Sequence, residues 1–590
     1  MSKRKEFVLL ALIGVIIFFL STLQVKDILS IWNQNDEFGV WQGGAWILGL
    51  DWSEVVSTNG YYGHGYGFIL ALFIKIWGNN TVFMTHMAIY FQALIHVSCI
   101  FIARYCIAKL FPKSDIVTRV IASTVCILNI PDLFYIYMFF SESWLRLLVW
   151  IIFGLVVSYY DNPKWYKLLL VAWISIYSFS VHQRCILLVA EALVLIAFEI
   201  ARYFIKNGFD IKVFFKVSIV LLLIGIFYFV EYKYGQNSYI NALYRNGGGE
   251  SVGSNLLSER GFTLKGILLD YFFNKEAEKI AIQNMFGMIY YICAFDCGFF
   301  LFGVILCVSK IKRGVKDKNG EKIIPFLVIL CTVLLGILLV VYQNANGYVY
   351  SRVEIMHYGR YCSYLLTPMF MLGIVYVLTE KENILIRNTL YILLLFLLSG
   401  TITYTVLKTH NVTNLFAFAN ACPGIKSVYY TDNPFTATLY HTVLGVIWIL
   451  FPIVMIVVAS KHKKVEKQIR IGIFIIVAIT WIYIANEEWN ETHKTHNVYV
   501  VRTYDLQSIL REVDEFVAFK SFSYGSGLLQ YNNPYSKIHV CQTLEEFDEE
   551  ENGLLVVSQK GIEEMEEICK KYNVEYENDR YFVWKYEIGK

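Results

Sequence analysis

The sequence predicts an α-helical polytopic membrane protein with a small α/β domain at its C-terminus. Of its 590 residues, 56% are hydrophobic and 17% are charged, and the mean hydropathy is +0.49. A water-soluble protein of this length does not bury so much apolar surface, so most of the chain belongs in a bilayer. The formal net charge of +3 gives no basic surface of the kind that nucleic acid needs, which excludes nucleic acid as a partner.

The hydropathy pattern predicts about 13 transmembrane helices, because each apolar segment is close to the length that crosses a bilayer. The predicted spans lie at residues 7–24, 82–108, 116–130, 143–159, 166–181, 185–205, 214–230, 284–308, 323–342, 363–379, 388–406, 441–460 and 471–486. The first span follows the basic start MSKRKE, and no small-residue cleavage site comes after it. It is therefore expected to remain in the protein as a signal anchor.

Basic residues collect on alternate loops, as expected of cytoplasmic connections. The segments SKRK, KLFPK, NPKWYK, KNGFDIK, KIKRGVKDKNGEK and KHKKVEKQIR all fall on one side of the membrane when the spans are counted in order. The protein is thus expected in the cytoplasmic membrane, with its N-terminus in the cytoplasm and its C-terminus outside. Three long loops, 25–81, 231–283 and 407–440, then lie on the outer face, which suggests that chemistry takes place there.

The sequence divides into a transmembrane domain, residues 1–486, and an extracytoplasmic α/β domain, residues 487–590. Strand patterns occur at VYVV, KIHVC, LLVVS and YFVWKY, and helical patterns at LQSILREVDEF and GIEEMEEICKKY. The acidic run EEFDEEEN is expected in solvent, because its contiguous acids lack the spacing of a calcium loop. Without a nucleophile motif or phosphate loop, this domain is expected to support binding or assembly.

An acid pair, Asp36-Glu37, stands shortly after the first span, where the chain emerges on the outer face. Four tryptophans, Trp32, Trp41, Trp46 and Trp52, accompany it in the loop 25–81 at near-helical spacing. Such helices are expected in the headgroup region, where they would hold Asp36 at the level at which a lipid-linked phosphate meets water. An acid at this place is also common at an ordinary helix exit, so the pair alone leaves both interpretations open.

The order of features over residues 1–160 resembles the GT-C superfamily of membrane glycosyltransferases, which includes protein O-mannosyltransferases and the aminoarabinose transferases of lipid A. These features are one span, the acid pair, interfacial aromatic helices, the turn YYGHGYG, a short apolar helix and a long second span. The resemblance implies that Asp36 takes the proton of the acceptor and that the sugar arrives on a polyprenyl phosphate. The family's His-Pro-Pro turn is replaced here by Gly63-His64-Gly65, so the subfamily and the sugar stay open.

Further site candidates lie at the outer ends of other spans. Glu142 begins the fourth span, where free helix N–H groups favour a carboxylate, and it is a second catalytic candidate beside Asp36 and Glu37. An arginine at such depth usually faces protein, water or an anion, although it can also snorkel to the interface. The candidates for the donor phosphate are Arg360, Arg352, Arg184 and His357, and those for other substrate contacts are His64, Tyr62 and Tyr358.

The sequence therefore predicts a glycosyltransferase that moves a sugar from a polyprenyl-phosphate donor to a cell-envelope glycan, a lipid-linked glycan or a protein outside the membrane. The main alternative is a transporter or flippase of lipid-linked glycans, which would use the intramembrane acids Asp296 and Glu191 together with Arg184. A glycan polymerase or ligase and a non-catalytic assembly protein are further alternatives. No cysteine or histidine has metal-ligand spacing, so no metal site is predicted, although the acid pair leaves room for a divalent cation.

Overall fold

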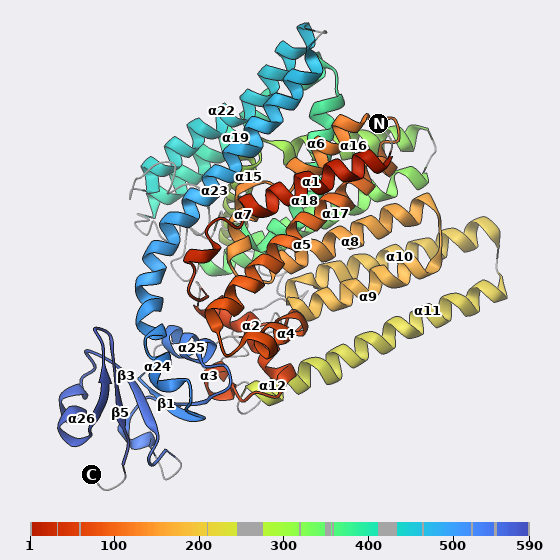
Figure 1. The fold of residues 1–590 in the computed structure, drawn as a ribbon. Coiled ribbons are helices and arrows are strands. Elements are labelled where there is room, and N and C mark those ends of the chain that lie inside the picture. The colour runs from red at the N-terminus through yellow and green to blue at the C-terminus, as the bar shows by residue number, and fades with distance from the viewer. Residues whose placement is uncertain are drawn as a thin grey trace.

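The computed structural model shows a bundle of long helices with a small sheet domain attached at one end (Figure 1). It describes residues 3–31, 34–57, 61–208, 210–244, 275–317, 320–348, 356, 359–410, 434–462, 465–520, 523–547 and 551–587. The predicted fold class, a polytopic helical membrane protein with a C-terminal α/β domain, is confirmed.

Nine helices in the described part of the chain are long and apolar enough to cross a membrane, or up to eleven if each of two bent pairs is one span. The nine lie at α1 (Lys3–Leu20), α5 (Thr81–Leu110), α8 (Glu142–Asp161), α11 (Ile211–Phe229), α17 (Ile324–Tyr348), α18 (Arg360–Thr379), α19 (Glu382–Thr409), α22 (Pro434–Lys461) and α23 (Glu466–Tyr504). Two more predicted spans are formed by α9 (Trp165–Val181) and α10 (Ile186–Asn207). The count is roughly the one that hydropathy predicts.

Two predicted spans are not straight helices. The span predicted at 116–130 consists of α6 (Ile116–Val125) and, after a bend of 58°, α7 (Ile130–Phe134). The span predicted at 284–308 bends by 104° between α15 (Lys275–Phe295) and α16 (Phe299–Lys316). The second bend arises because two consecutive left-handed residues, Cys297 and Gly298, break the helix, and hydropathy does not report such a local turn.

The shorter helices gather between the bundle and the C-terminal domain (Figure 1). They are α2 (Gln34–Leu48), α3 (Ser53–Ser57), α4 (Gly67–Trp77), α12 (Asn237–Leu243) and the π-helix η4 (Val230–Gln236). Single 3₁₀ turns lie at η1 (Val25–Asp27), η2 (Tyr135–Tyr137), η3 (Gln183–Cys185) and η6 (Gly320–Lys322). The N-terminus lies at the opposite end of the bundle, so most of the predicted outer-loop residues that the structure describes share one end.

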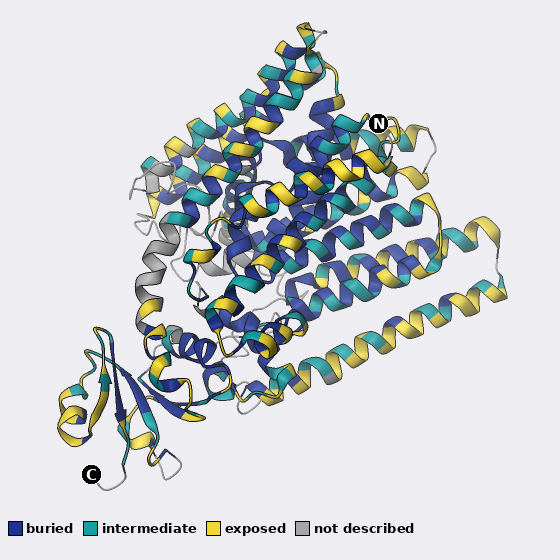
Figure 2. Cartoon of the chain, in the orientation of Figure 1, coloured by how far each residue is buried: buried dark blue, intermediate teal, exposed yellow. Residues whose placement is uncertain are grey.

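Burial separates the inner helices of the bundle from the outer ones (Figure 2). In the apolar stretch of α18, 94% of the residues are buried, whereas the value for the stretch that includes α11 is 17%. A helix that is apolar all round is stable either inside a protein or against lipid, and these two helices show the two cases. The first residue of the central helix α18 is Arg360, which the bundle therefore holds from all sides.

The C-terminal domain is a five-stranded sheet with the order β2-β1-β3-β5-β4. The strands are β1 (Glu515–Phe519), β2 (Lys537–Cys541), β3 (Leu555–Gln559), β4 (Val574–Glu577) and β5 (Tyr581–Lys585). The first three are parallel to one another, and β5 runs antiparallel to both β3 and β4. Helices α24 (Gln507–Leu510), α25 (Ser523–Asn532) and α26 (Met565–Lys571) and the turn η8 (Leu544–Glu546) complete the domain.

The strand patterns KIHVC, LLVVS and YFVWKY are confirmed as β2, β3 and β5, but VYVV is not a strand. It lies within α23, which continues beyond the apolar segment as one helix, so helix continuation overrides the strand preference of valine. The segment LQSILREVDEF divides between α24 and the start of β1. Strand β4 and helix α25 lack a clear periodic pattern and were not predicted.

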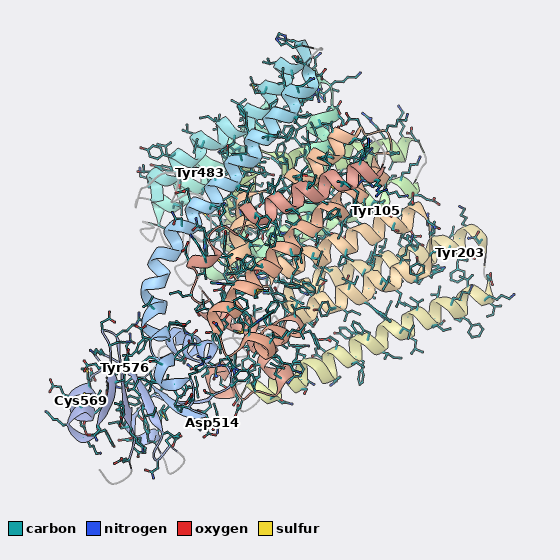
Figure 3. The ribbon with its side chains drawn as sticks, in the orientation of Figure 1. Tyr105, Tyr203, Tyr483, Asp514, Cys569 and Tyr576 are labelled. Carbon is teal, nitrogen blue, oxygen red and sulfur yellow. The ribbon has the colours of Figure 1, made fainter. Side chains whose placement is uncertain are left out.

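The sheet packs directly on the transmembrane domain. Phe516, Ala518 and Ile538 belong to the same hydrophobic core as the helix bundle, whereas Phe519 and Trp584 form a separate core on the other face of the sheet. Figure 3 shows Asp514, Cys569 and Tyr576 on the domain, and Cys569 is the only exposed cysteine among those described. One face of the domain is thus an interior surface of the protein.

Helix α2 packs against α25 of this domain. Its expected position in the headgroup region stays a prediction. The side chains of Trp41 and Trp52 are buried, and the Trp41 ring meets the Tyr531 ring edge to face at 5.2 Å. The indole N–H of Trp52 donates a hydrogen bond of 2.8 Å to the carbonyl of Pro534. Aromatic side chains that the hydropathy pattern suggests for the headgroup region thus pack against other parts of the protein. Trp32 lies outside the described residues.

Candidate active site

Asp36 lies in the first turn of α2, and its carboxylate has partners from two distant segments. Its Oδ2 lies 2.7 Å from Nη1 of Arg360, and its Oδ1 accepts a hydrogen bond from the hydroxyl of Tyr62. The Asp36 side chain is 26% exposed, so a substrate hydroxyl has access to it. The structure thus brings together three of the residues that the sequence predicts for the site.

Arg360 bridges the two acids from the start of α18. Its Nε lies 3.2 Å from Oε1 of Glu142, which begins α8. The guanidinium also lies over the ring of Phe140, with 4.0 Å between Cζ and the ring centroid. Because the Arg360 side chain is only 7% exposed, its charge is desolvated and acts strongly on nearby anions.

The electrostatic surroundings keep Asp36 ionised. Burial alone would raise the pKa of Asp36, but the charge of Arg360, the Tyr62 hydroxyl and the charge of Arg184 hold that pKa below its usual value. Burial and the negative charge of Asp36 raise the pKa of Tyr62, which therefore stays protonated and donates its hydrogen bond. Asp36 is consequently a carboxylate at neutral pH, in the form that accepts a proton.

Arg184 is the second cation at this site. It belongs to η3, and its guanidinium Cζ lies 3.5 Å from the ring centroid of Tyr361, the residue after Arg360. Arg360 lies over the same ring at 5.3 Å. The two arginines therefore flank one tyrosine ring, although they are far apart in the sequence.

Glu37 has a different setting from Asp36. Its side chain is fully buried, and its Oε1 accepts a hydrogen bond from the backbone N–H of Phe139. This contact ties α2 to the segment that carries Phe140 and Glu142. The predicted catalytic role of Glu37 stays a prediction.

His64 also lies apart from Asp36. Its Nε2 lies 2.8 Å from Oε1 of Glu231, at the start of η4, and its side chain is buried. Glu231 was not predicted, although it directly follows the predicted span 214–230. An acid at the outer end of a span is the signal that would have found it. The remaining candidates Arg352, His357 and Tyr358 lie outside the described residues.

The two acids on which the transporter alternative depends have local partners. Asp296 accepts hydrogen bonds from the backbone N–H groups of Gly298 and Phe300, so it caps the start of α16 at the bend. Glu191 accepts a hydrogen bond from the hydroxyl of Thr332 on α17. Both contacts join helix ends or neighbouring helices, and Oε1 of Glu191 is buried without a hydrogen-bond partner among the described residues.

Two aromatic rings of the site were not predicted as functional, Phe140 and Tyr361. Each packs against an arginine, and this relationship depends on which helices meet. Tyr361 offered one signal in the sequence, since it directly follows Arg360 in the run Tyr-Gly-Arg-Tyr. As for metal binding, no group of three or more His, Cys, Asp or Glu side chains that would hold an ion occurs among the described residues.

Comparison with solved structures identifies the same arrangement of helices in another protein. ArnT from Cupriavidus metallidurans, bound to undecaprenyl phosphate, matches 99% of this chain and 98% of its own with a TM-score of 0.50 and 10% sequence identity. Its apo structure matches with the same values. The oligosaccharyltransferase AglB from Archaeoglobus fulgidus matches 96% of this chain and 70% of its own, with a TM-score of 0.39 and 11% identity.

No protein-family model matches the sequence, and no curated protein is similar to it in sequence. The likeness to ArnT therefore concerns the arrangement of the whole chain in space and not its amino-acid sequence. It covers both the helix bundle and the C-terminal domain. The chain thus has the fold of ArnT.

Proposed function

We propose that this protein is a membrane glycosyltransferase that moves a sugar from a polyprenyl-phosphate donor to an acceptor on the outer face of the cytoplasmic membrane. The observation that carries the proposal is the cluster of Asp36, Arg360, Glu142 and Arg184, which pairs a solvent-accessible carboxylate with two buried cations. The fold supports it, since the ArnT structure of the same fold holds undecaprenyl phosphate.

In the proposed reaction, a hydroxyl of the acceptor attacks the anomeric carbon of the donor sugar. The new C–O bond forms as the bond between the sugar and the phosphate oxygen breaks, and the configuration at carbon inverts. The proton of the hydroxyl passes to Asp36, and the polyprenyl phosphate leaves with the electron pair. A positioned general base of this kind contributes roughly 10²–10⁴ in rate.

Arg360 and Arg184 supply the positive charge that the departing phosphate requires. Both are desolvated and held in place by aromatic rings, so they are preorganised for an anion. A bound phosphate would also compete with Asp36 for Arg360. Because Arg360 lowers the pKa of Asp36, this competition would make Asp36 a stronger base when the donor is present.

The orientation follows from the basic loops. The cluster, the helices α2 to α4 and the C-terminal domain lie at the end of the bundle opposite the N-terminus (Figure 1). With the N-terminus in the cytoplasm, the site faces outward and the C-terminal domain is extracytoplasmic. The sequence has few prolines and many Ile, Lys, Asn and Tyr residues, as is typical of AT-rich bacterial genomes. Because a bacterial composition suggests a bacterial cell envelope, a cell-envelope glycan is the first acceptor to examine.

The test is mass spectrometry of cell-envelope glycans and glycoproteins from cells that express wild type, Asp36→Asn or Asp161→Asn at matched membrane levels. Asp161 is a surface acid at the cytoplasmic end of α8 and serves as the control. We expect one sugar substituent to disappear in Asp36→Asn alone, and its mass identifies the sugar. A shortened polymer in place of a lost substituent would indicate a polymerase or ligase.

An unchanged glycan profile in Asp36→Asn would contradict the proposal. If Asp296→Asn then abolished export of a lipid-linked glycan in cells with normal protein levels, the transporter alternative would replace it. The two variants therefore separate the two functions, because Asp36 belongs to the cluster whereas Asp296 caps a helix.

A further inference from the structure

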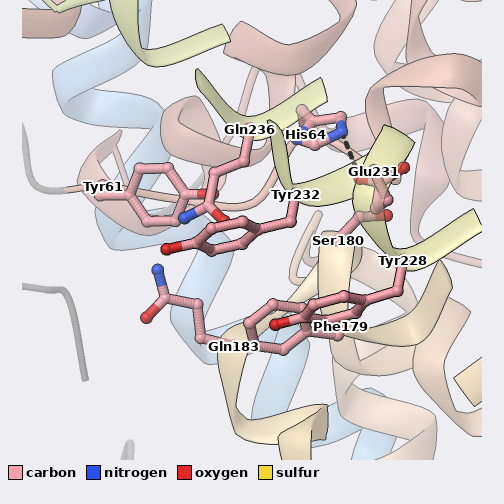
Figure 4. Close-up of a pocket in the computed structure, with 9 residues that line it drawn as sticks. All are labelled: Tyr61, His64, Phe179, Ser180, Gln183, Tyr228, Glu231, Tyr232 and Gln236. Carbon is pink, nitrogen blue, oxygen red and sulfur yellow. Dashed lines mark ion pairs between the residues drawn. The ribbon is translucent and has the colours of Figure 1, made fainter. Parts of the chain in front are cut away.

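A second, aromatic pocket lies beside the proposed active site (Figure 4). Its walls come from three segments of the chain, the turn that follows α3, the end of α9 with η3, and the end of α11 with η4. It is lined by Tyr61, His64, Phe179, Ser180, Gln183, Tyr228, Glu231, Tyr232 and Gln236. None of these side chains belongs to the cluster around Arg360.

Two pairs of neighbouring residues form the partition between this pocket and the cluster. Tyr61 lines the pocket, whereas the hydroxyl of the next residue, Tyr62, donates to Asp36. Gln183 lines the pocket, whereas the next residue, Arg184, stacks on Tyr361 and lowers the pKa of Asp36. The pocket and the cluster are thus built on adjacent residues of the same two segments.

The chemistry of the lining suits a saccharide. A sugar ring has an apolar face of C–H groups and a rim of hydroxyls, so it needs aromatic surface and hydrogen-bonding groups together. The rings of Tyr228 and Tyr232 are parallel, with centroids 5.9 Å apart and an angle of 4° between their planes. In Figure 4 the amides of Gln183 and Gln236 lie near the rings of Tyr61 and Tyr232.

The pocket also has a graded exposure, which gives a ligand an entrance and a floor. Tyr228 and Tyr232 are 39% and 43% exposed, whereas His64 is 1% exposed. Nδ1 of His64 is buried and has no hydrogen-bond partner among the described residues. A buried nitrogen without a partner costs free energy unless a ligand or water meets it. The enclosed space of the pocket is about 10 Å³, room for one water, so a sugar ring would lie at the open mouth against Tyr228 and Tyr232.

The backbone at this place is unusual as well. Residues Val230–Gln236 form a π-helix, a rare conformation that occurs frequently at functional sites. Its wider turn places Glu231 and Gln236, five residues apart, on the same pocket. An aromatic residue that merely anchors a helix in the interface needs neither this turn nor the buried His64–Glu231 pair.

We propose that this pocket is a saccharide-binding subsite that holds a sugar residue of the acceptor or of the donor next to Asp36. The proposal rests on the proposed function for the role of the bound sugar, but binding itself requires no transfer. It makes Tyr232, Tyr228 and Gln236 specificity-determining residues, which contact a substrate ring without taking part in the proton transfer.

The test is saturation-transfer NMR on the purified full chain in lipid nanodiscs. The probes are glucose, galactose, N-acetylglucosamine and ribitol, with cyclohexanol as an apolar probe of similar size. The proteins are wild type, Asp36→Asn, Tyr232→Ala, Gln236→Ala and the control Tyr166→Ala, which removes an exposed ring from the far end of α9. Gel filtration establishes that each variant is folded.

We expect at least one saccharide to bind to wild type, Asp36→Asn and Tyr166→Ala. Its affinity should fall about tenfold in Tyr232→Ala and measurably in Gln236→Ala, on the scale typical of truncating an aromatic contact. The absence of saccharide binding, equal binding to Tyr232→Ala, or equal binding of cyclohexanol would overturn the proposal.

The same series distinguishes this proposal from the proposed function. If saccharides bind but Asp36→Asn leaves the glycans of the cell unchanged, the pocket is established and the transferase is not. If the sugar that binds is the one that Asp36→Asn cells lack, the pocket holds the donor sugar. If it is a different sugar of the same glycan, the pocket holds the acceptor.

Discussion

Arg360 and Asp36 form an ion pair of 2.7 Å between the central helix α18 and the short helix α2. The Arg360 side chain is buried, whereas the Asp36 side chain is partly exposed to solvent. A second acid, Glu142, lies 3.2 Å from the same guanidinium. One cation therefore fixes the positions of two carboxylates from separate helices. This arrangement leads to specific expectations for the residues around it.

Replacing Arg360 should change the pH dependence of transfer. Because Arg360 lowers the pKa of Asp36, Arg360→Gln should raise that pKa, and Asp36 would then become protonated at higher pH. The acidic limb of the pH–rate profile, measured in membrane vesicles, should shift upward, and the rate should also fall. Arg360→Lys keeps the charge but loses the fork of donors and should lie between the two. An acidic limb at the wild-type position in Arg360→Gln would show that Asp36 is not the base.

Tyr62→Phe should have a smaller effect of the same sign. The substitution removes one hydrogen bond to the Asp36 carboxylate and leaves the charge of Arg360 in place. We expect a smaller upward shift of the acidic limb and a modest loss of rate, measured in the same assay. Tyr66→Phe is the matched control, since Tyr66 belongs to the same turn but stacks on Trp144. Equal profiles for Tyr62→Phe and Tyr66→Phe would contradict a role for the Tyr62 hydroxyl.

Gly359→Ala should displace the start of α18. A β-carbon at Gly359 would overlap the ring of Tyr291, so either that ring or Arg360 has to move. Overpacking of this kind costs about 1–3 kcal/mol, and we expect a lower thermal unfolding midpoint together with reduced transfer. Gly225→Ala is the control, because no atom lies within 4 Å of its β-carbon. A wild-type midpoint and rate in Gly359→Ala would show that this contact does not position Arg360.

Asp296→Asn should affect stability and not transfer. The acid caps α16 through two backbone N–H groups, and asparagine retains one acceptor oxygen. We expect a loss of about 0.5–2 kcal/mol, as for other helix caps, measured as a lower unfolding midpoint in detergent. Glycan profiles of cells at matched protein levels should stay at wild type. Their loss would mean that Asp296 has a functional role beyond the cap.

The junction of α3 with the sheet should be sensitive to pH. Nδ1 of His539 lies 3.1 Å from Oε1 of Glu54, and this contact raises the pKa of His539 above its usual 6.5, although burial opposes the shift. The stabilisation is therefore complete below about pH 6.5 and disappears as the pH rises through the folded pKa. We expect the unfolding midpoint of wild type to fall as the pH rises above about 6.5, and to fall less in Glu54→Gln, where Glu515 and Glu551 remain near the histidine.

The matched control for this junction is Glu512→Gln, an exposed acid on the same domain. It should keep the pH dependence of wild type. Retention of that dependence in Glu54→Gln would assign it to another group. Glu551 lies 3.8 Å from the same histidine and is buried, which corrects the expectation that the whole acidic run lies in solvent, although residues 548–550 lie outside the described ones.

The sequence by itself determined the class of the protein, the positions of its apolar helices and most strands of the sheet. These features depend on the composition and periodicity of each local segment, which are independent of the tertiary contacts that the segment makes. It also predicted that Asp36, Glu142, Arg184 and Arg360 lie near the ends of spans on the same side of the membrane. The reason is that the basic loops mark the opposite, cytoplasmic side.

Only the tertiary structure decided which of these residues meet. The pairing of Arg360 with Asp36 and Glu142 depends on how α2, α8 and α18 pack. The burial of Trp41 against Tyr531 of the C-terminal domain also depends on a contact between distant segments. Such contacts are fixed by shape and by the satisfaction of buried polar groups, and neither is a property of a local stretch of sequence.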